Sequence, residues 1–353
     1  MAFLDTLLGR GKAPKRIHIL PHDLTIEARP GQTLLEAALA AGIAYPHNCT
    51  VGNCAACKTR LRQGRVREAT PFGYTLSKQE LDAGYILACQ AEPRDALTLV
   101  EIEPAGAALP PAESFRATLE GTEALTHDIL RVTLRTDRPV HYVAGQYATL
   151  QAPGLPRGRH YSFADPPQRE GRTALNFFIR RVPGGAFTQA LFDGGLAGAT
   201  LALDAPHGQF FLRAGTAPMV CVAGGSGLAP LLSLLADAQN SRTRRPVTLL
   251  FGARTQADLY MQAGIEALAR NWPERFDFVP VLSHEPPGSP WRGRRGLVTE
   301  VLTASMATGA QGYLCGPPPM IDACIERLAQ FDVPLEAIHY DKFTDARDAA
   351  PRA

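Results

Sequence analysis

The sequence predicts a multidomain chain in which an α+β domain, an antiparallel β-barrel and an α/β domain follow one another. Three observations support this prediction. Strand-like and helix-like segments mix in residues 15–103, short strands separated by turn residues fill 115–206, and buried strands alternate with helices from residue 216. With 353 residues, 45% of them hydrophobic, the chain is long enough to build two or three cores.

The domain boundaries follow from changes in these patterns. Residues 103–114, EPAGAALPPAES, are rich in proline and alanine and lack periodicity, which indicates a linker; a long surface loop within one domain is the alternative. We expect an N-terminal tail at 1–14, domains at 15–103, 114–214 and 215–345, a linker at 104–113 and a C-terminal tail at 346–353.

Composition narrows the class of protein. No secretory leader is evident near Met1, and no apolar run approaches the roughly 18 residues of a membrane span. The formal net charge of +2 gives no basis for nucleic-acid binding. We therefore expect a cytoplasmic protein that binds no nucleic acid; we also expect a monomer.

The first domain has the outline of a β-grasp fold. Residues 15–29 alternate like two strands around a turn at Pro21–Asp23, and GQTLLEAALAAG at 31–42 has the apolar face of a helix ending at Gly42. A cysteine-containing loop follows, then a strand at 58–66, a helix, and a last strand at 96–102.

Three of the seven cysteines lie within this loop. Disulfides are disfavoured because the count is odd and Cys221 lies in an apolar strand. Zinc usually takes two closely spaced pairs, whereas this loop has one CxxC and His47 lies outside it. The spacing C-x4-C-x2-C, with a distant fourth cysteine in YILACQAE, is instead typical of a [2Fe–2S] site. The expected metal ligands are Cys49, Cys54, Cys57 and Cys89.

Two motifs of the barrel suggest a flat, phosphate-bearing ligand. In RHYS, alternation places Arg159 and Tyr161 on one face and Ser162 on the other. The arginine can pair with a diphosphate, the tyrosine ring can stack on a flat heterocycle, and the serine hydroxyl can hydrogen-bond a ring nitrogen. A Gly184–Gly185 turn opens a helix near Thr188, where N–H groups suit a phosphate. Each motif alone also fits an ordinary half-exposed strand or a common turn.

The α/β segment has a Rossmann-like pattern. A buried strand runs into the turn Gly224-Gly225-Ser226-Gly227, and a helix begins near Leu228 with Pro230 in its first turn. The turn lacks strict G-x-G-x-x-G spacing, so this signal is weak by itself. A later strand ends in the rigid turn CGPPP, where Cys315 is either part of a site or a small buried residue.

Taken together and in this order, the motifs resemble the reductase components of multicomponent bacterial oxygenases. Residues 15–103 are similar to plant-type ferredoxins, although Thr50 and Ala55 replace the usual Arg or Lys and Gly; the later domains resemble ferredoxin–NADP reductases. The ending HYDKF at 339–343 is similar too. Within the family, PHNCTVGNCAACK and GYILACQ look most like the xylene monooxygenase electron-transfer subgroup.

The resemblance implies a set of site residues. Ser162 and Cys315 would serve hydride transfer. The implied FAD contacts are Arg159, His160, Tyr161, Ser162, Gly184, Gly185, Phe187, Thr188 and Phe343. The implied NAD contacts are Gly224, Gly225, Ser226, Gly227, Arg254, Cys315, Gly316 and Pro317.

The implied function is conversion of hydride into single electrons, passed from NADH to FAD, to the cluster and to an oxygenase (hydroxylase) partner. One alternative is the same electron chain serving a desaturase or a sugar-deoxygenation enzyme. The other is that the protein is a non-enzymatic redox carrier or sensor. NADPH is an alternative donor if a 2′-phosphate is held by arginines; the candidates are Arg254, Arg292, Arg294 and Arg295.

In the xylene monooxygenase subgroup the partner is a membrane-embedded di-iron hydroxylase, which implies peripheral contact with the inner membrane through the partner. The N-terminal tail offers a second route, since Phe3, Leu4, Leu7 and Leu8 would share one helical face with basic residues after it. A frayed terminus is the alternative for this segment.

Overall fold

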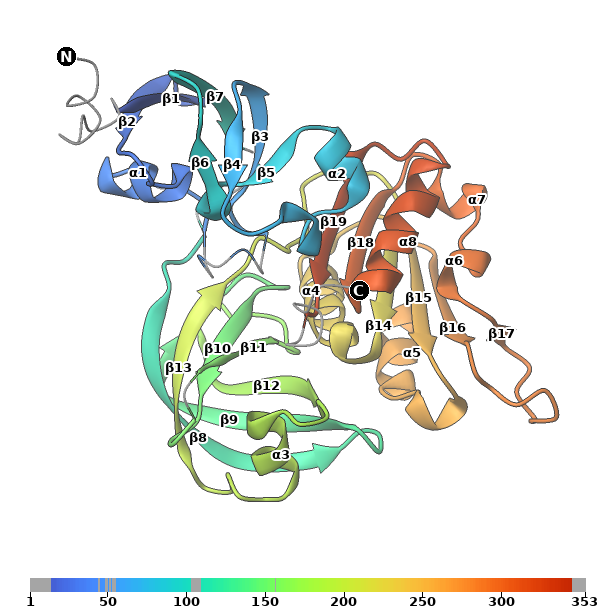
Figure 1. Ribbon diagram of the computed structural model, residues 1–353. Coiled ribbons are helices and arrows are strands. Elements are labelled where there is room, and N and C mark those ends of the chain that lie inside the picture. Colours follow the sequence, from blue (N-terminus) through green and yellow to red (C-terminus); the bar gives the residue numbers. More distant parts are fainter. Residues whose placement is uncertain are drawn as a thin grey trace, which may run out of the picture. The chain divides into compact units, whose positions relative to one another are not determined.

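The computed structural model describes residues 14–43, 45–47, 50, 52, 55–102, 109–155 and 157–344. The chain forms two compact units, residues 1–106 and 107–353 (Figure 1). The predicted ligands Cys49 and Cys54, the tails apart from Pro14, and residues 104–108 of the expected linker lie outside the described residues.

The first unit is built on a five-stranded mixed sheet in the order β2-β1-β7-β3-β5, as the β-grasp prediction requires. Its strands are β1 (Lys15–Leu20), β2 (Leu24–Ala28), β3 (Lys58–Gln63), β5 (Tyr85–Leu87) and β7 (Leu97–Ile102). Two short elements, β4 (Val66–Glu68) and β6 (Ala91–Pro93), pair beside it. The single strand expected at 58–66 is therefore two, divided at Gly64, where a Cβ would lie 2.9 Å from the carbonyl oxygen of Leu97.

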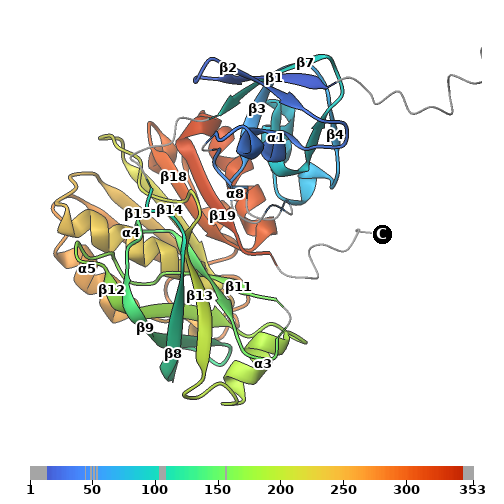
Figure 2. The ribbon, with the colours of Figure 1, turned by 90° about the vertical axis from the view of Figure 1, so that its left-hand side faces the viewer.

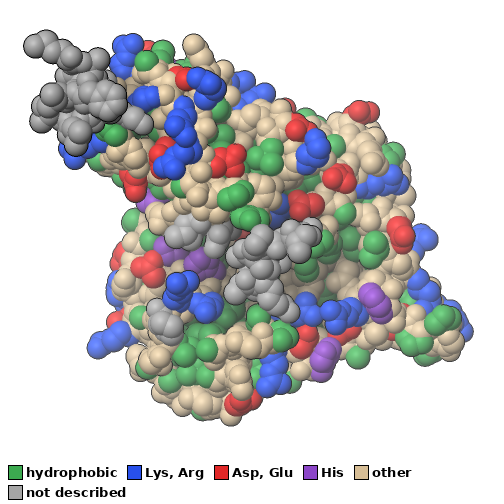
Figure 3. Space-filling view, viewed as in Figure 1, with side chains coloured by type: hydrophobic (Ala, Val, Ile, Leu, Met, Phe, Trp, Pro, Cys, Tyr) green, Lys and Arg blue, Asp and Glu red, His purple; other side chains and the backbone are tan. Residues whose placement is uncertain are grey.

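Helix α1 (Leu34–Ala40) packs its apolar side on this sheet (Figure 2). Its start is fixed by a capping box, in which the Thr33 hydroxyl accepts from the Glu36 N–H and the Glu36 carboxylate accepts from the Thr33 N–H. A second capping box, Ser77 with Glu80, starts the short α2 (Lys78–Asp82). Acidic and basic side chains intermingle on the visible face of the unit (Figure 3). Surface ion pairs of this unit include Arg62–Glu101, Arg65–Asp95 and Arg67–Glu92.

The second unit begins with a barrel of six antiparallel strands in the order β11-β10-β13-β8-β9-β12. These are β8 (Glu113–Ala124), β9 (Ile129–Val140), β10 (Tyr147–Gln151), β11 (Arg159–Ser162), β12 (Arg172–Arg180) and β13 (Thr200–His207). A bridge between Phe163 and Phe177 joins the two edge strands and closes the barrel. Helix α3 (Ala186–Phe192) starts two residues earlier than expected.

A fully parallel sheet of six strands follows, in the order β17-β16-β15-β14-β18-β19 (Figure 1). They are β14 (Met219–Gly224), β15 (Val247–Ala253), β16 (Phe276–Leu282), β17 (Arg294–Arg295), β18 (Gln311–Gly316) and β19 (Ile338–Lys342). Helices α4 (Leu228–Asn240) and α5 (Gln262–Arg270) cover one face, and α6 (Val298–Val301) and α8 (Pro318–Ala329) cover the other. Pattern reasoning identified four of these strands but not β17 or β19.

The barrel and the parallel sheet share one hydrophobic core, so the expected boundary at 214/215 falls inside the second unit. Phe178 and Phe210 of the barrel pack in the same cluster as Cys221, Leu231 and Phe251. The joining segment is held by the fully buried Arg245, whose guanidinium donates to the carbonyls of Ala217 and Arg213 and to the Gln311 side chain. These three acceptors compensate the desolvation of a charge that has no carboxylate partner among them.

Among the described residues, no helix is both long enough and apolar enough to cross a membrane.

Candidate functional site

The structure brings two of the predicted cluster ligands together. Cys57 lies just before β3, and Cys89 follows β5, which pairs with β3. The Cys89 N–H donates to the Cys57 sulfur at 3.4 Å, and the Ala88 N–H donates to the Cys57 carbonyl at 3.1 Å. Both cysteines are buried. Two thiols side by side, with a backbone N–H directed at one sulfur, match the donor set of a cysteine-ligated iron site.

In the barrel, β11 carries RHYS with the predicted alternation. Ser162 is 5% exposed and lies opposite Tyr147 of β10, whereas Tyr161 points the other way and packs its ring 5.4 Å from that of Phe187. His160 stacks on Tyr147, with ring centroids 5.1 Å apart. Arg159 is exposed, and its guanidinium donates to the backbone carbonyls of Gly158 and Arg157. Its guanidinium therefore faces solvent, where it could bind a diphosphate.

The glycine turn before α3 is held by Thr188, which the sequence placed among the FAD contacts. Its hydroxyl accepts from the Val182 N–H at 3.1 Å and lies 3.1 Å from the Gly185 carbonyl. Gly184 has φ 72° and open space where a Cβ would be. Phe187 is 2% exposed and belongs to the barrel core. The side chains of Phe187 and Thr188 thus shape the turn from inside, which leaves the backbone around Gly184 to face a ligand.

The glycine turn after β14 meets the end of β18 at the point where the strand order reverses. The chain passes from β14 to β15 on one side and returns to β18 on the other, and ligands of open parallel sheets bind outside the carboxyl ends of the strands at such a point. A Cβ on Gly227 would lie 2.5 Å from the Cys315 carbonyl carbon and 2.8 Å from the Gly316 nitrogen. A Cβ on Gly224 would lie 2.9 Å from Pro317 Cδ. The two predicted NAD segments are therefore in direct backbone contact.

The end of β19 completes this edge of the sheet. The Phe343 N–H donates to the Gly316 carbonyl at 2.9 Å, and Phe343 packs partly buried against the shared core. Cys315 is fully buried, which raises the pKa of its thiol well above the ordinary value; the nearby Asp341 raises it further. Arg254, directly after β15, is exposed.

Two further contacts link the nucleotide turn to the barrel. The Tyr260 hydroxyl donates to the Gly225 carbonyl at 2.9 Å, and its ring meets Phe178 of β12 edge-on at 5.5 Å. Arg180, at the end of β12, lies near Gly225 and pairs with Asp128 at 2.8 Å. The turn expected to hold a nucleotide is thus positioned by the barrel as well as by its own sheet.

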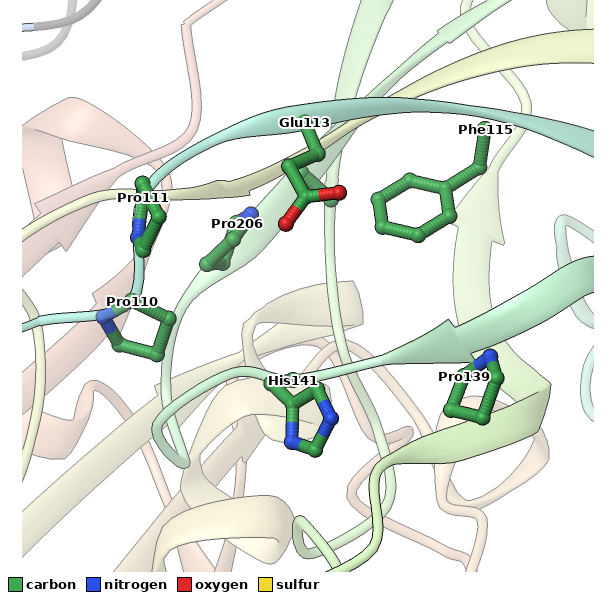
Figure 4. Close-up of a pocket in the computed structure, with 8 residues that line it drawn as sticks. Pro110, Pro111, Glu113, Phe115, Pro139, His141 and Pro206 are labelled. Atoms are coloured by element: carbon green, nitrogen blue, oxygen red, sulfur yellow. The ribbon is translucent and has the colours of Figure 1, made fainter.

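A small cavity of about 200 Å³ lies elsewhere on the barrel, where β8 begins and where β9 and β13 end (Figure 4). In Figure 4 the Glu113 carboxylate points into the space between Pro206 and His141. Glu113 also pairs with Arg138 at 2.8 Å. The lining contains none of the predicted site residues: Pro110, Pro111, Glu113, Phe115, Pro139, His141, Ala205 and Pro206.

Three family models match the chain. They describe a 2Fe-2S iron-sulfur cluster binding domain over residues 17–94, an oxidoreductase FAD-binding domain over 116–212 and an oxidoreductase NAD-binding domain over 221–326. The electron-transfer component of xylene/toluene monooxygenase from Pseudomonas putida is 44% identical over 315 residues, which cover 89% of each chain. The reductase component of phenol 2-monooxygenase from Pseudomonas sp. strain CF600 is 36% identical over 95% of this chain and 96% of the relative.

The chain belongs to the family of electron-transfer components of multicomponent monooxygenases.

Solved structures agree with this family. The Amycolatopsis cytochrome P450 reductase has a TM-score of 0.71 and 35% identity, covering 94% of this chain and 99% of that chain. A ferredoxin reductase of carbazole 1,9a-dioxygenase has a TM-score of 0.67, 31% identity and the same coverage. This electron-transfer component is thus an oxidoreductase of the ferredoxin-reductase type. The predicted cofactor set, FAD, a [2Fe–2S] cluster and NADH, is confirmed by the matching domains.

The described residues fit these groups. The cysteine pair supplies thiolate donors, the open Gly184 backbone faces outward, and the Gly224–Gly227 turn leaves no room for side chains against β18. Residues in the glycine turns would meet phosphates through backbone N–H groups. The individual contacts assigned from the sequence remain predictions.

Sequence reasoning missed Asp341 and Tyr260, although HYDKF contains the first of them. Asp341 lies opposite Cys315 in the strand pairing of β18 and β19. The residue as a whole is partly exposed, but its carboxyl group is buried. Desolvation raises the pKa of Asp341 to about 7. The signal that could have found it is an acidic residue two positions before Phe343, in a strand adjacent to CGPPP. Tyr260 had no comparable signal, because its partner lies 35 residues away.

We expect Asp341→Asn to make the second unit more stable at alkaline pH. Because the folded pKa lies above the unfolded value, the folded state binds the proton more tightly, and wild-type stability falls as pH rises from about 4 to about 7. The asparagine variant lacks this pH-dependent loss. Its free energy of unfolding should therefore exceed that of the wild type by an amount that grows over this interval to roughly 2–4 kcal/mol and then levels off.

Thermal unfolding midpoints of both proteins at pH 4.5 and pH 8, with FAD present, measure this difference. Glu336→Gln, which removes an exposed carboxylate near the start of β19, is the matched control and should show no such trend. An Asp341→Asn advantage that is the same at both pH values would contradict the assignment of a raised pKa.

Proposed function

We propose that this chain takes hydride from NADH and delivers single electrons to the hydroxylase of a hydrocarbon monooxygenase. The observation that carries this proposal is the 44% identity to the xylene/toluene monooxygenase electron-transfer component, spread over 89% of both chains and all three cofactor domains. When bound, FAD accepts an electron pair and releases electrons singly, and a [2Fe–2S] centre carries one at a time.

Residues on the nucleotide side would bind NADH and position it for hydride transfer. Gly224–Gly227 and Gly316–Pro317 would hold the nucleotide at the strand-order reversal, with Arg254 beside it. The Ser162 hydroxyl, which is nearly buried on β11, would donate to the flavin ring, and Cys315 would limit the space available to the nicotinamide. Neither side chain acts as an acid or base here, since hydride transfer depends chiefly on positioning.

On the flavin side, Arg159 would pair with the diphosphate, which the turn at Gly184–Gly185 would also contact. Tyr161 would stack on the ring system, His160 would be a further FAD contact on the other face of β11, and Phe343, anchored through Gly316, would cover the ring. The thiolates of Cys49, Cys54, Cys57 and Cys89 would hold the cluster. The adjacency of Cys57 and Cys89 supports this last assignment.

NADH is proposed as the donor in preference to NADPH. Arg295, one of the arginines considered for a 2′-phosphate, is already engaged: it donates to the carbonyls of Glu285 and Pro286 and to the Ser289 hydroxyl, which holds the loop after β16. Arg254, Arg292 and Arg294 are exposed and would contact the diphosphate or solvent. A preference for NADPH in steady-state kinetics would overturn this part of the proposal.

The acceptor is proposed to be a membrane-embedded di-iron hydroxylase, with the chain working as a cytoplasmic monomer that reaches the inner membrane through this partner. The resemblance to the xylene monooxygenase subgroup supports the partner.

Reconstitution tests the function directly. Purified reductase, NADH and membranes containing a xylene or toluene hydroxylase should give NADH-dependent hydroxylation of the arene. The same membranes without reductase are the control. If NADH reduces an artificial acceptor but supports product formation only with a desaturase, a sugar-deoxygenation enzyme or a cytochrome P450, the acceptor assignment is wrong. If NADH does not bleach the flavin anaerobically, the chain is not a reductase.

A further inference from the structure

Gln90 follows the predicted ligand Cys89 and is 8% exposed. Its side-chain nitrogen lies 2.9 Å from the Cys89 carbonyl, 3.0 Å from the Thr50 carbonyl and 3.7 Å from the Cys89 sulfur. All three neighbours are hydrogen-bond acceptors, so the amide must present its NH₂ group, and not its oxygen, to this side. A nearly buried amide thus directs its donors at the cysteine and at the cluster loop.

Gly52 of the loop lies directly against this side chain. A Cβ on Gly52 would come within 2.9 Å of Gln90 Cγ, which leaves no room for a side chain. Gly52 also has φ 86°, a backbone conformation that residues with a side chain rarely adopt. Thr50 adopts φ 55°, which is unfavourable for a β-branched residue and persists only where neighbours enforce it. From the other side, the Thr75 hydroxyl donates to the Gly52 carbonyl at 2.5 Å. Gln90 and Thr75 therefore contact the loop at its described residues Thr50 and Gly52.

The Gln90 side chain also reaches a sulfur, that of the described ligand Cys89. Reduction of an iron–sulfur centre adds negative charge that spreads onto its sulfur ligands, and N–H donors to those sulfurs stabilise the added charge and raise the reduction potential. The Thr75 hydroxyl donates to the Gly52 carbonyl. The Gln90 amide donates to the Thr50 carbonyl and to the carbonyl and sulfur of Cys89.

We propose that Gln90 is a positioning residue that holds the cluster loop in place and raises the reduction potential of the cluster through an N–H···S bond to Cys89. This inference rests on the proposed ligand role of Cys89. It makes the last residue of GYILACQ a determinant of the driving force with which electrons enter the cluster.

The test compares three variants of the full-length holoprotein. Gln90→Met keeps the length of the side chain but removes both donors. Thr75→Val removes the other loop anchor and leaves the sulfur contact unchanged. Gln63→Met makes the same chemical change at an exposed position at the end of β3. Anaerobic redox titration followed by EPR gives the potential, and iron release to a chelator gives the stability of the loop.

For Gln90→Met we expect the ratio of reduced to oxidised cluster at a fixed potential to fall roughly three- to tenfold, a tenfold change being about 59 mV for one electron. The EPR g values should change as well, and iron release should be faster. For Thr75→Val we expect faster iron release at an unchanged potential. For Gln63→Met we expect no change in either. If Gln90→Met leaves the potential and g values unchanged, or if Thr75→Val shifts the potential equally, the proposal is overturned.

A measurement on the wild type covers the case in which Gln90→Met assembles no cluster. With ¹⁵N only in glutamine side chains, pulsed EPR of the reduced protein should show a weak coupling to one amide nitrogen, and its absence would overturn the proposal. Failure of the underlying ligand assignment is a separate result, since Cys89→Ser would then retain an intact cluster.

Discussion

Replacing Cys89 by serine is expected to remove the cluster while NADH still reduces a small artificial acceptor. The substitution removes one thiolate ligand of the cluster, next to the ligand Cys57. A serine hydroxyl binds iron poorly in place of a soft thiolate. Changes beyond the ligand shell already cost 10- to 100-fold in metal affinity, so the loss of a ligand should cost more than about 100-fold in electron delivery to a protein acceptor.

The second unit should be unaffected, because its core is built from its own residues. The first unit has a separate cluster that includes Ile17, Leu34 and Val100, whereas the flavin and nucleotide segments pack in other clusters. Units with independent cores fold independently. Ferricyanide reduction by NADH should therefore persist, while reduction of cytochrome c or of the hydroxylase should be lost.

Iron analysis, the visible spectrum and both acceptor assays make this measurement. Cys324→Ala is the matched control: it removes a fully buried cysteine from α8, far along the chain from the loop, and should leave iron content unchanged. If Cys89→Ser kept transfer between proteins intact, the cluster would not lie on the electron path.

Gly227→Ala is expected to slow flavin reduction by NADH by roughly 100-fold or more. Gly227 has a helical φ of −62°, so the backbone itself would accept alanine. The obstacle is the methyl group, which would meet the Cys315 carbonyl carbon at 2.5 Å, and still more closely its oxygen. The turn and the end of β18 would have to move apart, and a misplacement of about 1 Å at a reacting centre can cost about 100-fold.

Anaerobic stopped-flow bleaching of the flavin by NADH measures the effect, with the cluster and FAD contents checked first. Gly288→Ala is the control, because a Cβ there meets nothing within 4 Å and its φ is not positive. If Gly227→Ala reduced its flavin at the wild-type rate, the contact between the turn and β18 would not position the nucleotide. Unchanged reduction of the cluster by dithionite would show that the defect is confined to the second unit.

The sequence by itself determined the elements whose causes are local. The order of three folds, the start of α4 at Leu228 and the strands of the barrel follow from hydrophobic spacing and turn residues within a few positions of each other. The cysteine spacing predicted a [2Fe–2S] domain, which the family match confirms. The resemblance of the three domains, in their order, predicted the family.

Only the tertiary structure decided the features that depend on distant partners. Nothing near Gly227 indicates that it must stay free of a side chain; the reason is the β18 backbone, nearly 90 residues later, which pairs beside β14. Gln90 becomes part of the candidate site because folding places its amide against Thr50, and Asp341 because β19 lines up with Cys315. Hydrophobic periodicity specifies which face of an element is buried, but not which element lies against it, so these contacts appear only once the strands are paired.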